Sequence, residues 1–210
     1  MDSQLLSKAI EYVREFFDKD SSGHDFYHTM RVYKSAVMLA EKEGADVGLT
    51  ALAALLHDVD DKKLSPDTHE GFENARSFMT ANGVDETAQS KVIDIISKVS
   101  YTGDSSPVPE SVEGKCVQDA DRLDAMGAIG IARAFAFGGS RGRKMYDPEI
   151  SPQDIGMDGN STSLNHFYEK LFKLKGLMNT ETARAIAQER DRFMHSFVDE
   201  FLKEWDGEDC

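Results

Sequence analysis

Apolar residues recur at three- and four-residue spacing along most of this chain, and this periodicity constrains its fold more than any other feature. The longest apolar stripe runs from Ala183 to Trp205. Such spacing places side chains on one face of an α-helix, and the alternation typical of a half-buried strand is nearly absent. The sequence therefore predicts an all-α protein. No internal repeat and no Ser/Gly-type linker divides it, so we expect one compact helical domain over residues 1–210.

Local signals predict where several helices begin and end. Asp46 precedes the apolar run 49–56 and suits the N-cap position of a short helix. That run is apolar on most sides, which predicts the central buried helix. Asp67 with Glu70 three residues later forms a capping-box pattern, which predicts that a fourth helix opens there. A long apolar helix over 116–137 is expected to break near Gly127 or Gly130.

Composition excludes several classes of protein. The formal net charge is −14, and so acidic a protein repels the backbone of DNA or RNA. The two cysteines, Cys116 and Cys210, form no disulfide framework, which favours a reducing cytoplasm. No run of 18 apolar residues occurs, and residues 1–17 are charged throughout, so we expect neither a membrane span nor a signal peptide.

Side chains that can bind a metal occur at three places where a purely structural role explains them poorly. At the first, His28 and Arg31 share one face near the start of a predicted helix. Taken alone, this pair also suits an ordinary polar helix face.

The second place is the doublet His57-Asp58, which ends the most apolar helix in the chain. An unpaired buried carboxylate is very unfavourable, and coordination of a divalent metal compensates it. A His-Asp pair at a helix C-terminus is the structural alternative. Three carboxylates at this negative end, those of Asp58, Asp60 and Asp61, argue against that alternative unless a cation lies nearby.

The third place carries three aspartates inside six residues of an otherwise apolar helix: Asp119, Asp121 and Asp124. Arg122 lies among them, so a buried ion-pair network is the plain structural alternative.

Together these places resemble the HD-domain phosphohydrolase superfamily, whose pattern is H…HD…D on an all-helical core. The resemblance rests on His28 in His-Thr-Met-Arg-Val, on the doublet in Ala-Leu-Leu-His-Asp-Val-Asp-Asp-Lys, and on Asp121 in Asp-Ala-Asp-Arg-Leu-Asp-Ala. It covers about residues 20–140, the expected metal-binding core, with C-terminal helices over 161–206 packing on that core. The run Gln-Asp-Ala-Asp-Arg-Leu-Asp-Ala-Met-Gly-Ala-Ile-Gly-Ile-Ala-Arg and the later Ser-Leu-Asn-His-Phe-Tyr-Glu-Lys-Leu look closer still to a bacterial subgroup of nucleoside triphosphate pyrophosphohydrolases.

The resemblance implies one divalent metal with four ligands: His28, His57, Asp58 and Asp121. Mn²⁺ is the ion expected first, with Mg²⁺, Fe²⁺, Co²⁺ and Ni²⁺ as alternatives, and mixed nitrogen and oxygen ligation suits a transition metal. On spacing alone Asp119 competes with Asp121 for the fourth position. A two-metal version would need further ligands, and His69 is the histidine that follows the doublet soon enough.

Asp61, one helical turn past His57, is expected to accept a proton from the attacking water, with Asp60 as the second candidate for this role. Phosphate contacts are expected from basic side chains, although charge balancing among the aspartates explains Lys62 and Arg122 equally well. The five expected substrate-binding residues are Lys62, Arg31, Arg122, His24 and His166.

The resemblance implies hydrolysis of a (deoxy)nucleoside triphosphate to a monophosphate and pyrophosphate. A 5′-nucleotidase and a cyclic-nucleotide phosphodiesterase are the enzymatic alternatives. A non-catalytic sensor that binds a nucleotide or metal is an alternative of another class. The expected partner is a small nucleotide, with no nucleic acid and no membrane. The stripe of the final helix fits packing inside the monomer or across a homodimer interface, and both remain open.

Overall fold

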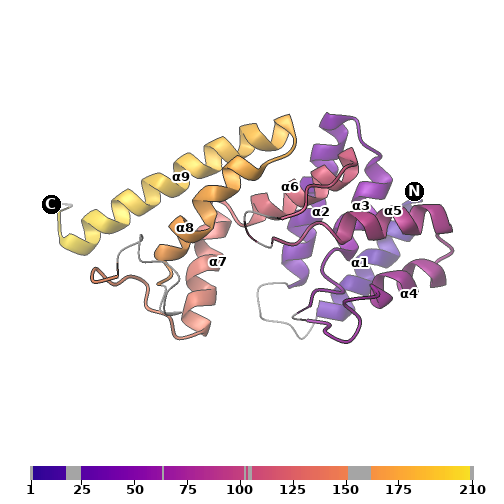
Figure 1. The fold of residues 1–210 in the computed structure, drawn as a ribbon, viewed down its shortest axis with the longest axis horizontal. Helices are drawn as coiled ribbons and strands as arrows, with labels where there is room; N and C mark the ends of the chain where they lie inside the picture. Colours follow the sequence, from indigo (N-terminus) through magenta and orange to yellow (C-terminus); the bar gives the residue numbers. More distant parts are fainter. Residues whose placement is uncertain are drawn as a thin grey trace. The chain divides into compact units, whose positions relative to one another are not determined.

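The structure is a computed structural model that describes residues 2–17, 25–62, 64–101, 103, 106–150 and 162–208. Within these ranges it consists of nine α-helices and one 3₁₀-helix, without strands, which confirms the all-α prediction (Figure 1). The helices are α1 (Ser3–Phe17), α2 (Phe26–Glu43), α3 (Val47–Leu56), α4 (Glu73–Ala81), α5 (Glu86–Ile96), α6 (Val112–Asp124), α7 (Gly127–Ser140), α8 (Asn165–Glu169), η1 (Leu171–Leu177) and α9 (Glu181–Asp206).

The helices gather into two compact units, Met1–Asp121 and Arg122–Cys210. Helices α1 to α5 and most of α6 belong to the first unit, and α7 to α9 belong to the second. The expected single domain over 1–210 and its core at about 20–140 stay predictions. No helix in the described ranges is long and apolar enough to cross a membrane.

Helix α3 is the centre of the first unit, as its sequence predicts. Every residue from Leu49 to Leu56 is buried, and α3 contacts α1, α2 and α5. The Asp46 carboxylate accepts a hydrogen bond from the backbone N–H of Leu49 at 2.9 Å, which confirms the predicted N-cap. The doublet His57-Asp58 follows this helix directly, so the best-buried element of the unit holds one end of the candidate site.

The predicted start of the fourth helix at Asp67 and Glu70 is wrong. Residues 64–72 form a series of turns, and α4 begins only at Glu73. Phe72 precedes α4 with a left-handed backbone (φ 52°) and contributes no side-chain cap. Asp60 supplies the cap from outside the helix, because its two carboxylate oxygens accept the backbone N–H groups of Asn74 at 3.1 Å and Ala75 at 2.9 Å. A buried carboxylate therefore replaces the local capping box.

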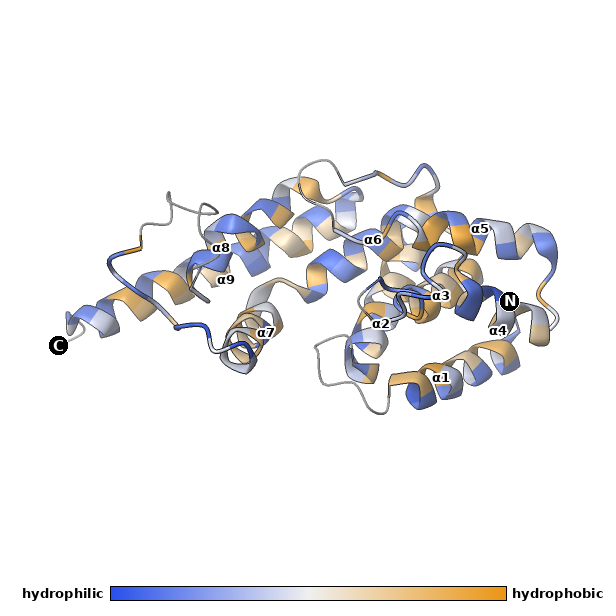
Figure 2. Ribbon diagram, turned by 60° about the horizontal axis from the view of Figure 1, so that its bottom comes forward, coloured by the Kyte–Doolittle hydropathy of each residue, from blue (hydrophilic) through white to orange (hydrophobic). Residues whose placement is uncertain are grey.

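In the second unit, α7 and η1 pack against α9. Helix α6 ends at Asp124 and α7 begins at Gly127 (φ 70°), which confirms the expected break. Aromatic rings from α7, α8 and α9 form a continuous cluster around the buried ring of Phe167, and its half-buried members are Phe135, Phe197 and Phe201. The ribbon of α9 changes repeatedly between hydrophobic and hydrophilic colours along its length, as an amphipathic helix does (Figure 2).

Two glycines of α7 are expected to respond oppositely to alanine. A Cβ atom at Gly130 would lie 2.2 Å from the carbonyl oxygen of Ala125, whereas a Cβ at Gly139 would meet nothing within 4 Å. Gly130→Ala should therefore lower the free energy of unfolding by about 1–3 kcal/mol through overpacking. Gly139→Ala should leave it unchanged or raise it by about 0.5–1 kcal/mol through helix propensity. Urea unfolding of both variants measures the difference, and equal effects would contradict the packing described here.

Cys116 is expected to resist thiol reagents in the folded protein. Its side chain is fully buried on α6, and burial together with Asp119 raises the pKa of its thiol to about 12. At pH 8 only about one thiol in ten thousand is then the reactive thiolate. A Cys210→Ser variant should take up a chromogenic disulfide reagent only after urea is added. Rapid uptake without urea would contradict the burial of α6.

Candidate metal centre

Three helices of the first unit bring together the side chains that the sequence singled out. His28 lies in the first turn of α2, where its backbone N–H donates to the N-cap Asp25 at 2.7 Å. His57 is the C-cap of α3, Asp58 follows it, and Asp121 lies on α6. Each residue is therefore fixed at or near a helix that packs into the core.

Both aspartates place a carboxylate oxygen within 4 Å of each histidine. Asp58 Oδ2 lies 3.3 Å from His28 Nε2 and 3.2 Å from His57 Nε2. Asp121 Oδ1 lies 3.4 Å and 3.9 Å from the same two nitrogens. Ligand atoms of His28, His57 and Asp58 all lie within 4.8 Å of one another, and these three buried residues could hold a metal ion.

The hydrogen bonding of His57 favours a cation at this point. Its Nδ1 lies 2.8 Å from the carbonyl oxygen of Ala54, and a carbonyl only accepts, so Nδ1 carries the proton. In the neutral ring Nε2 is then a lone pair facing the carboxylate oxygens of Asp58 and Asp121. This nitrogen is buried and has no hydrogen-bond partner among the described residues. A lone pair and carboxylates repel one another unless a proton or a metal cation lies between them, and this donor set of imidazole nitrogens and carboxylate oxygens fits a divalent transition metal.

The electrostatics of the site follow from burial and the close carboxylates. Burial lowers the pKa of His57, but Asp58 and Asp121 outweigh burial and raise the pKa above its ordinary value. Burial raises the pKa of Asp121. Its hydrogen bond to His28 and the charges of His28 and His57 outweigh burial and hold this pKa below its ordinary value. Negative charge on the carboxylates is thus favoured at the place where a cation would bind.

The three aspartates of α6 face different surroundings. Asp119 is fully buried and acts on the thiol of Cys116. Asp124 accepts an ion-paired hydrogen bond from Arg133 of α7 at 2.5 Å, a residue that the sequence-based alternative did not name. Asp121 is the aspartate of the three that lies within 4 Å of both His28 and His57. Geometry therefore favours Asp121 over Asp119 as the fourth ligand.

The two candidates for proton transfer differ in their surroundings as well. Asp60 is buried, with both carboxylate oxygens occupied at the start of α4. Asp61 is half-buried, and its backbone lies in turns. Its N–H donates to the carbonyl of Asp58 at 3.1 Å, and its own carbonyl accepts from the backbone N–H of Ser65 at 2.8 Å. Asp61 is thus the more exposed of the two carboxylates.

Asp60→Ala should lower the free energy of unfolding by about 1–3 kcal/mol, because two buried backbone N–H groups lose their acceptor. Asp85 is a matched control: it is the exposed N-cap of α5 and accepts from Ala88 at 3.0 Å. Asp85→Ala should cost about 1 kcal/mol or less. Urea unfolding compares the two, and wild-type stability of Asp60→Ala would contradict the capping role.

The expected substrate-binding residues are distributed over both units. Arg31 is half-buried one turn after His28, and Lys62 is exposed beside Asp61. Arg122 belongs to the second unit, where its guanidinium donates to the carbonyl of Leu177. His24 lies outside the described residues.

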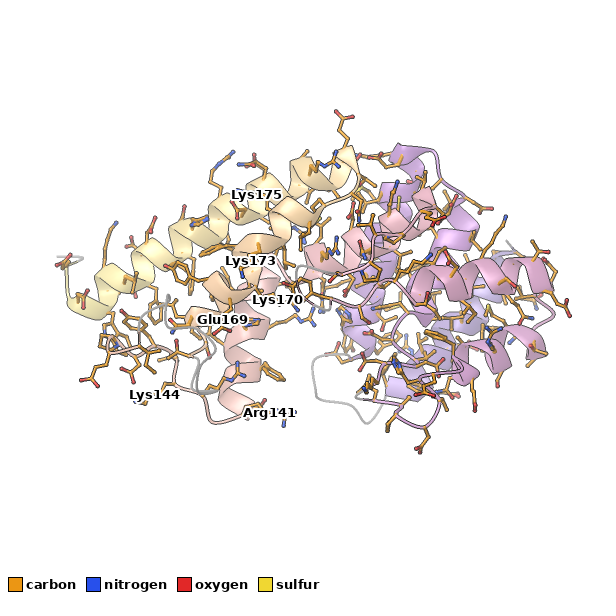
Figure 3. The ribbon with its side chains drawn as sticks, viewed as in Figure 1. Arg141, Lys144, Glu169, Lys170, Lys173 and Lys175 are labelled. Carbon is orange, nitrogen blue, oxygen red and sulfur yellow. The ribbon has the colours of Figure 1, made fainter. Side chains whose placement is uncertain are left out.

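His166 lies on α8 in the second unit, with Nδ1 3.5 Å from Glu169 Oε2. Burial lowers the pKa of His166, and the nearby cation of Lys170 lowers it further. Figure 3 shows the neighbouring charged side chains of this unit, among them Lys170, Lys173 and Lys175. Lys175 is paired with Asp191 at 2.5 Å.

The acidic excess of the chain is concentrated in the first unit. Residues 1–121 contain 12 Lys and Arg against 23 Asp and Glu, a net charge of −11 out of −14. The unit that carries the His and Asp cluster is therefore the one whose field attracts cations most strongly.

The sequence does not predict the side-chain hydrogen bonds that hold the backbone after the doublet. Asn74, Ser65 and His69 hydrogen-bond to the backbone of Val59 or Asp60. No local pattern signals these bonds, because the partners are 6 to 15 residues apart. His69 Nδ1 lies 2.8 Å from the carbonyl oxygen of Asp60, so this nitrogen hydrogen-bonds to the backbone.

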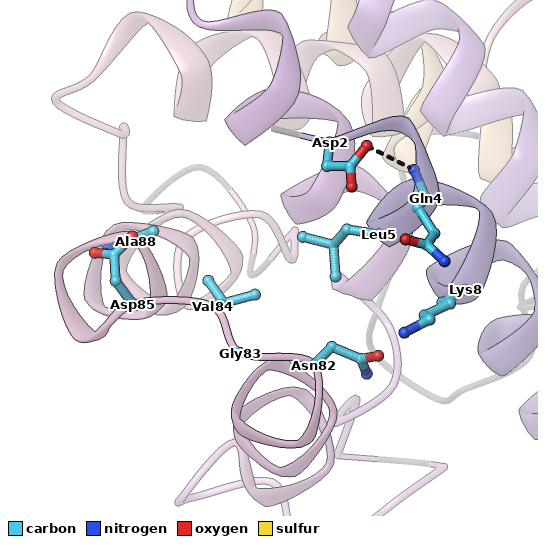
Figure 4. A pocket seen from close by; sticks show the side chains of 9 residues that line it. All are labelled: Asp2, Gln4, Leu5, Lys8, Asn82, Gly83, Val84, Asp85 and Ala88. Atoms are coloured by element: carbon cyan, nitrogen blue, oxygen red, sulfur yellow. Dashed lines mark hydrogen bonds between the residues drawn. The ribbon is translucent and has the colours of Figure 1, made fainter.

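A separate hollow lies between the start of α1 and the turn that joins α4 to α5 (Figure 4). Its lining includes Leu5, Lys8 and Asn82, and none of the expected site residues. It holds no histidine or cysteine.

Comparison with known proteins shows which family the chain resembles. The family model described as "HD domain" matches residues 25–126. YpgQ of Bacillus subtilis is 40% identical over 201 residues, which cover 95% of this chain and 93% of the relative. The crystal structure of an HD-superfamily hydrolase from Bacillus thuringiensis is similar with a TM-score of 0.79, at 46% identity over 96% of both chains. A structure of B. subtilis YpgQ in complex with ADP has a TM-score of 0.76 at 37% identity, over 95% of this chain and 97% of that one.

Proposed function

The chain belongs to the HD domain family of metal-dependent phosphohydrolases, and from this membership we propose that it is a (deoxy)nucleoside triphosphate pyrophosphohydrolase that uses Mn²⁺. The observation that carries the proposal is the convergence of two imidazoles and two carboxylates around the lone pair of His57 Nε2. The complex of YpgQ with ADP supports a nucleotide as the ligand.

In the proposed mechanism the metal is held by four residues: His28, His57, Asp58 and Asp121. When bound, such an ion lowers the pKa of a water ligand and neutralises charge on a phosphoryl oxygen. Asp61 accepts the proton of the attacking water, and Arg31 and Lys62 of the first unit neutralise phosphate oxygens. The carbonyl of Ala54 accepts from His57 Nδ1 and so orients the Nε2 of this ring toward the metal position.

The proposal places the activity in the cytoplasm, with a small nucleotide as partner. His24, Arg122 and His166 stay candidates for substrate contact, and a homodimer stays an expectation. The −14 net charge disfavours nucleic-acid backbones.

Product analysis tests the proposal. The purified, metal-free protein is incubated with Mn²⁺ and, separately, with the common ribo- and deoxyribonucleoside triphosphates, monophosphates and 3′,5′-cyclic monophosphates. Phosphorus NMR should show pyrophosphate and a monophosphate from triphosphates. Orthophosphate released from monophosphates would replace the proposal by a 5′-nucleotidase, and opening of cyclic nucleotides would replace it by a phosphodiesterase. Binding without turnover under any divalent metal would replace it by a sensor.

A further inference from the structure

Three side chains hold the peptide that follows the doublet, those of Ser65, His69 and Asn74. The carbonyl of Val59 accepts two hydrogen bonds, from Asn74 Nδ2 at 2.9 Å and from Ser65 Oγ at 3.0 Å. The next carbonyl, that of Asp60, accepts from His69 Nδ1 at 2.8 Å. Both carbonyls between Asp58 and Asp61 are thus bound by side chains from residues 65–74.

Asn74 is the centre of this arrangement. Its side-chain amide donates one hydrogen to Val59 and the other to Thr68 Oγ1, each at 2.9 Å. Its backbone N–H donates to the carboxylate of Asp60 at 3.1 Å. One residue therefore contacts both residues that separate Asp58 from Asp61.

The position of this peptide determines where two functional side chains point. Asp58 directly precedes Val59, and Asp61 directly follows Asp60. A shift of this peptide would move the Asp58 carboxylate away from His28 and His57, and would change the direction of the Asp61 side chain. A displacement of about 1 Å in a reacting group lowers rates by roughly a hundredfold.

We propose that Asn74 is the positioning residue of the metal site, holding the Val59–Asp60 peptide so that Asp58 faces the two histidines and Asp61 faces the substrate. This inference rests on the proposed function. Partners that orient metal ligands typically contribute a factor of about 10–100 to metal affinity or activity.

Asn82 offers a matched control on the same helix. It is the C-cap of α4, and its Nδ2 donates to the carbonyl of Phe78 at 2.9 Å. Asn74→Ala and Asn82→Ala thus each remove an asparagine side chain at one end of α4, but only the side chain of Asn74 bonds the peptide that follows the doublet. Ser65→Ala removes the other hydrogen bond to the carbonyl of Val59 and serves as a second variant if Asn74→Ala folds poorly.

The test measures Mn²⁺ affinity by calorimetry, kcat and KM for the preferred triphosphate, and the melting temperature. Asn74→Ala should weaken Mn²⁺ binding and lower kcat by about 10–100-fold each, with KM changed by about threefold or less. Ser65→Ala should change the same two quantities in the same direction by a smaller factor. Asn82→Ala should lower the melting temperature while leaving Mn²⁺ affinity and kcat at wild-type values.

Wild-type Mn²⁺ affinity and kcat in folded Asn74→Ala and Ser65→Ala would overturn the positioning role and leave the proposed function intact. Equal losses of affinity in Asn74→Ala and Asn82→Ala would also overturn it, because general destabilisation would then explain both. A wild-type protein that neither binds Mn²⁺ nor turns over any nucleotide would instead overturn the proposed function, and this inference with it.

Discussion

His57→Ala is expected to lose Mn²⁺ binding and to lower turnover by at least about a thousandfold, beyond the 10–100-fold typical of residues that only orient a ligand. The variant removes a buried nitrogen whose lone pair faces both carboxylates of the site. Asp58 and Asp121 then face His28 alone. Asp58→Asn should have a similar effect, because it removes the carboxylate that lies nearest to both histidines.

Thermal unfolding separates loss of metal from loss of fold. Mn²⁺ at a hundred times its Kd stabilises a protein by about 2.7 kcal/mol, which raises the melting temperature by about 5–10 °C at this chain length. Wild-type protein should show this shift and His57→Ala should not. His195→Ala is the control, because this histidine lies on α9 in the second unit and its side chain is 53% exposed. A metal-dependent shift of wild-type size in His57→Ala would contradict the account.

Asp61→Asn is expected to lower kcat by about 10²–10⁴-fold, the usual contribution of a general base, while Mn²⁺ affinity changes by about threefold or less. The amide keeps the shape of the side chain but no longer accepts a proton. Stopped-flow turnover and calorimetry on the same preparation give the two quantities.

Asp67→Asn is the matched control for Asp61→Asn, because Asp67 is exposed in the turns that follow the doublet. It should leave both quantities at wild-type values. Wild-type kcat in Asp61→Asn would assign proton transfer to another group. Loss of Mn²⁺ binding in this variant would make Asp61 a ligand and not a base.

Features that depend on neighbouring residues were predictable from the sequence. The N-cap at Asp46, the break before Gly127 and the burial of α3 from Leu49 to Leu56 each follow from a few adjacent residues, and the structure confirms them. The doublet was recognisable because a histidine and an aspartate at the end of so apolar a helix need compensation.

Features that depend on distant residues were not predictable. Asp67 and Glu70 carry the local capping pattern, yet α4 is capped by Asp60, which lies 14 and 15 residues from the N–H groups it accepts. The choice between Asp119 and Asp121 depends on which side of α6 faces His28, and spacing left both open. Asn74 gave no signal at all, because its role exists only once α4 lies beside Val59.

We expect four side chains of the first unit to hold one divalent metal: His28, His57, Asp58 and Asp121. Anomalous X-ray scattering at the manganese edge, from crystals grown with Mn²⁺, tests it most directly. The account predicts one peak per chain, within bonding distance of both Nε2 atoms and of one oxygen from each aspartate. A manganese peak bonded to Asp119 instead of Asp121, or no peak between His28 and His57 at saturating Mn²⁺, would contradict it.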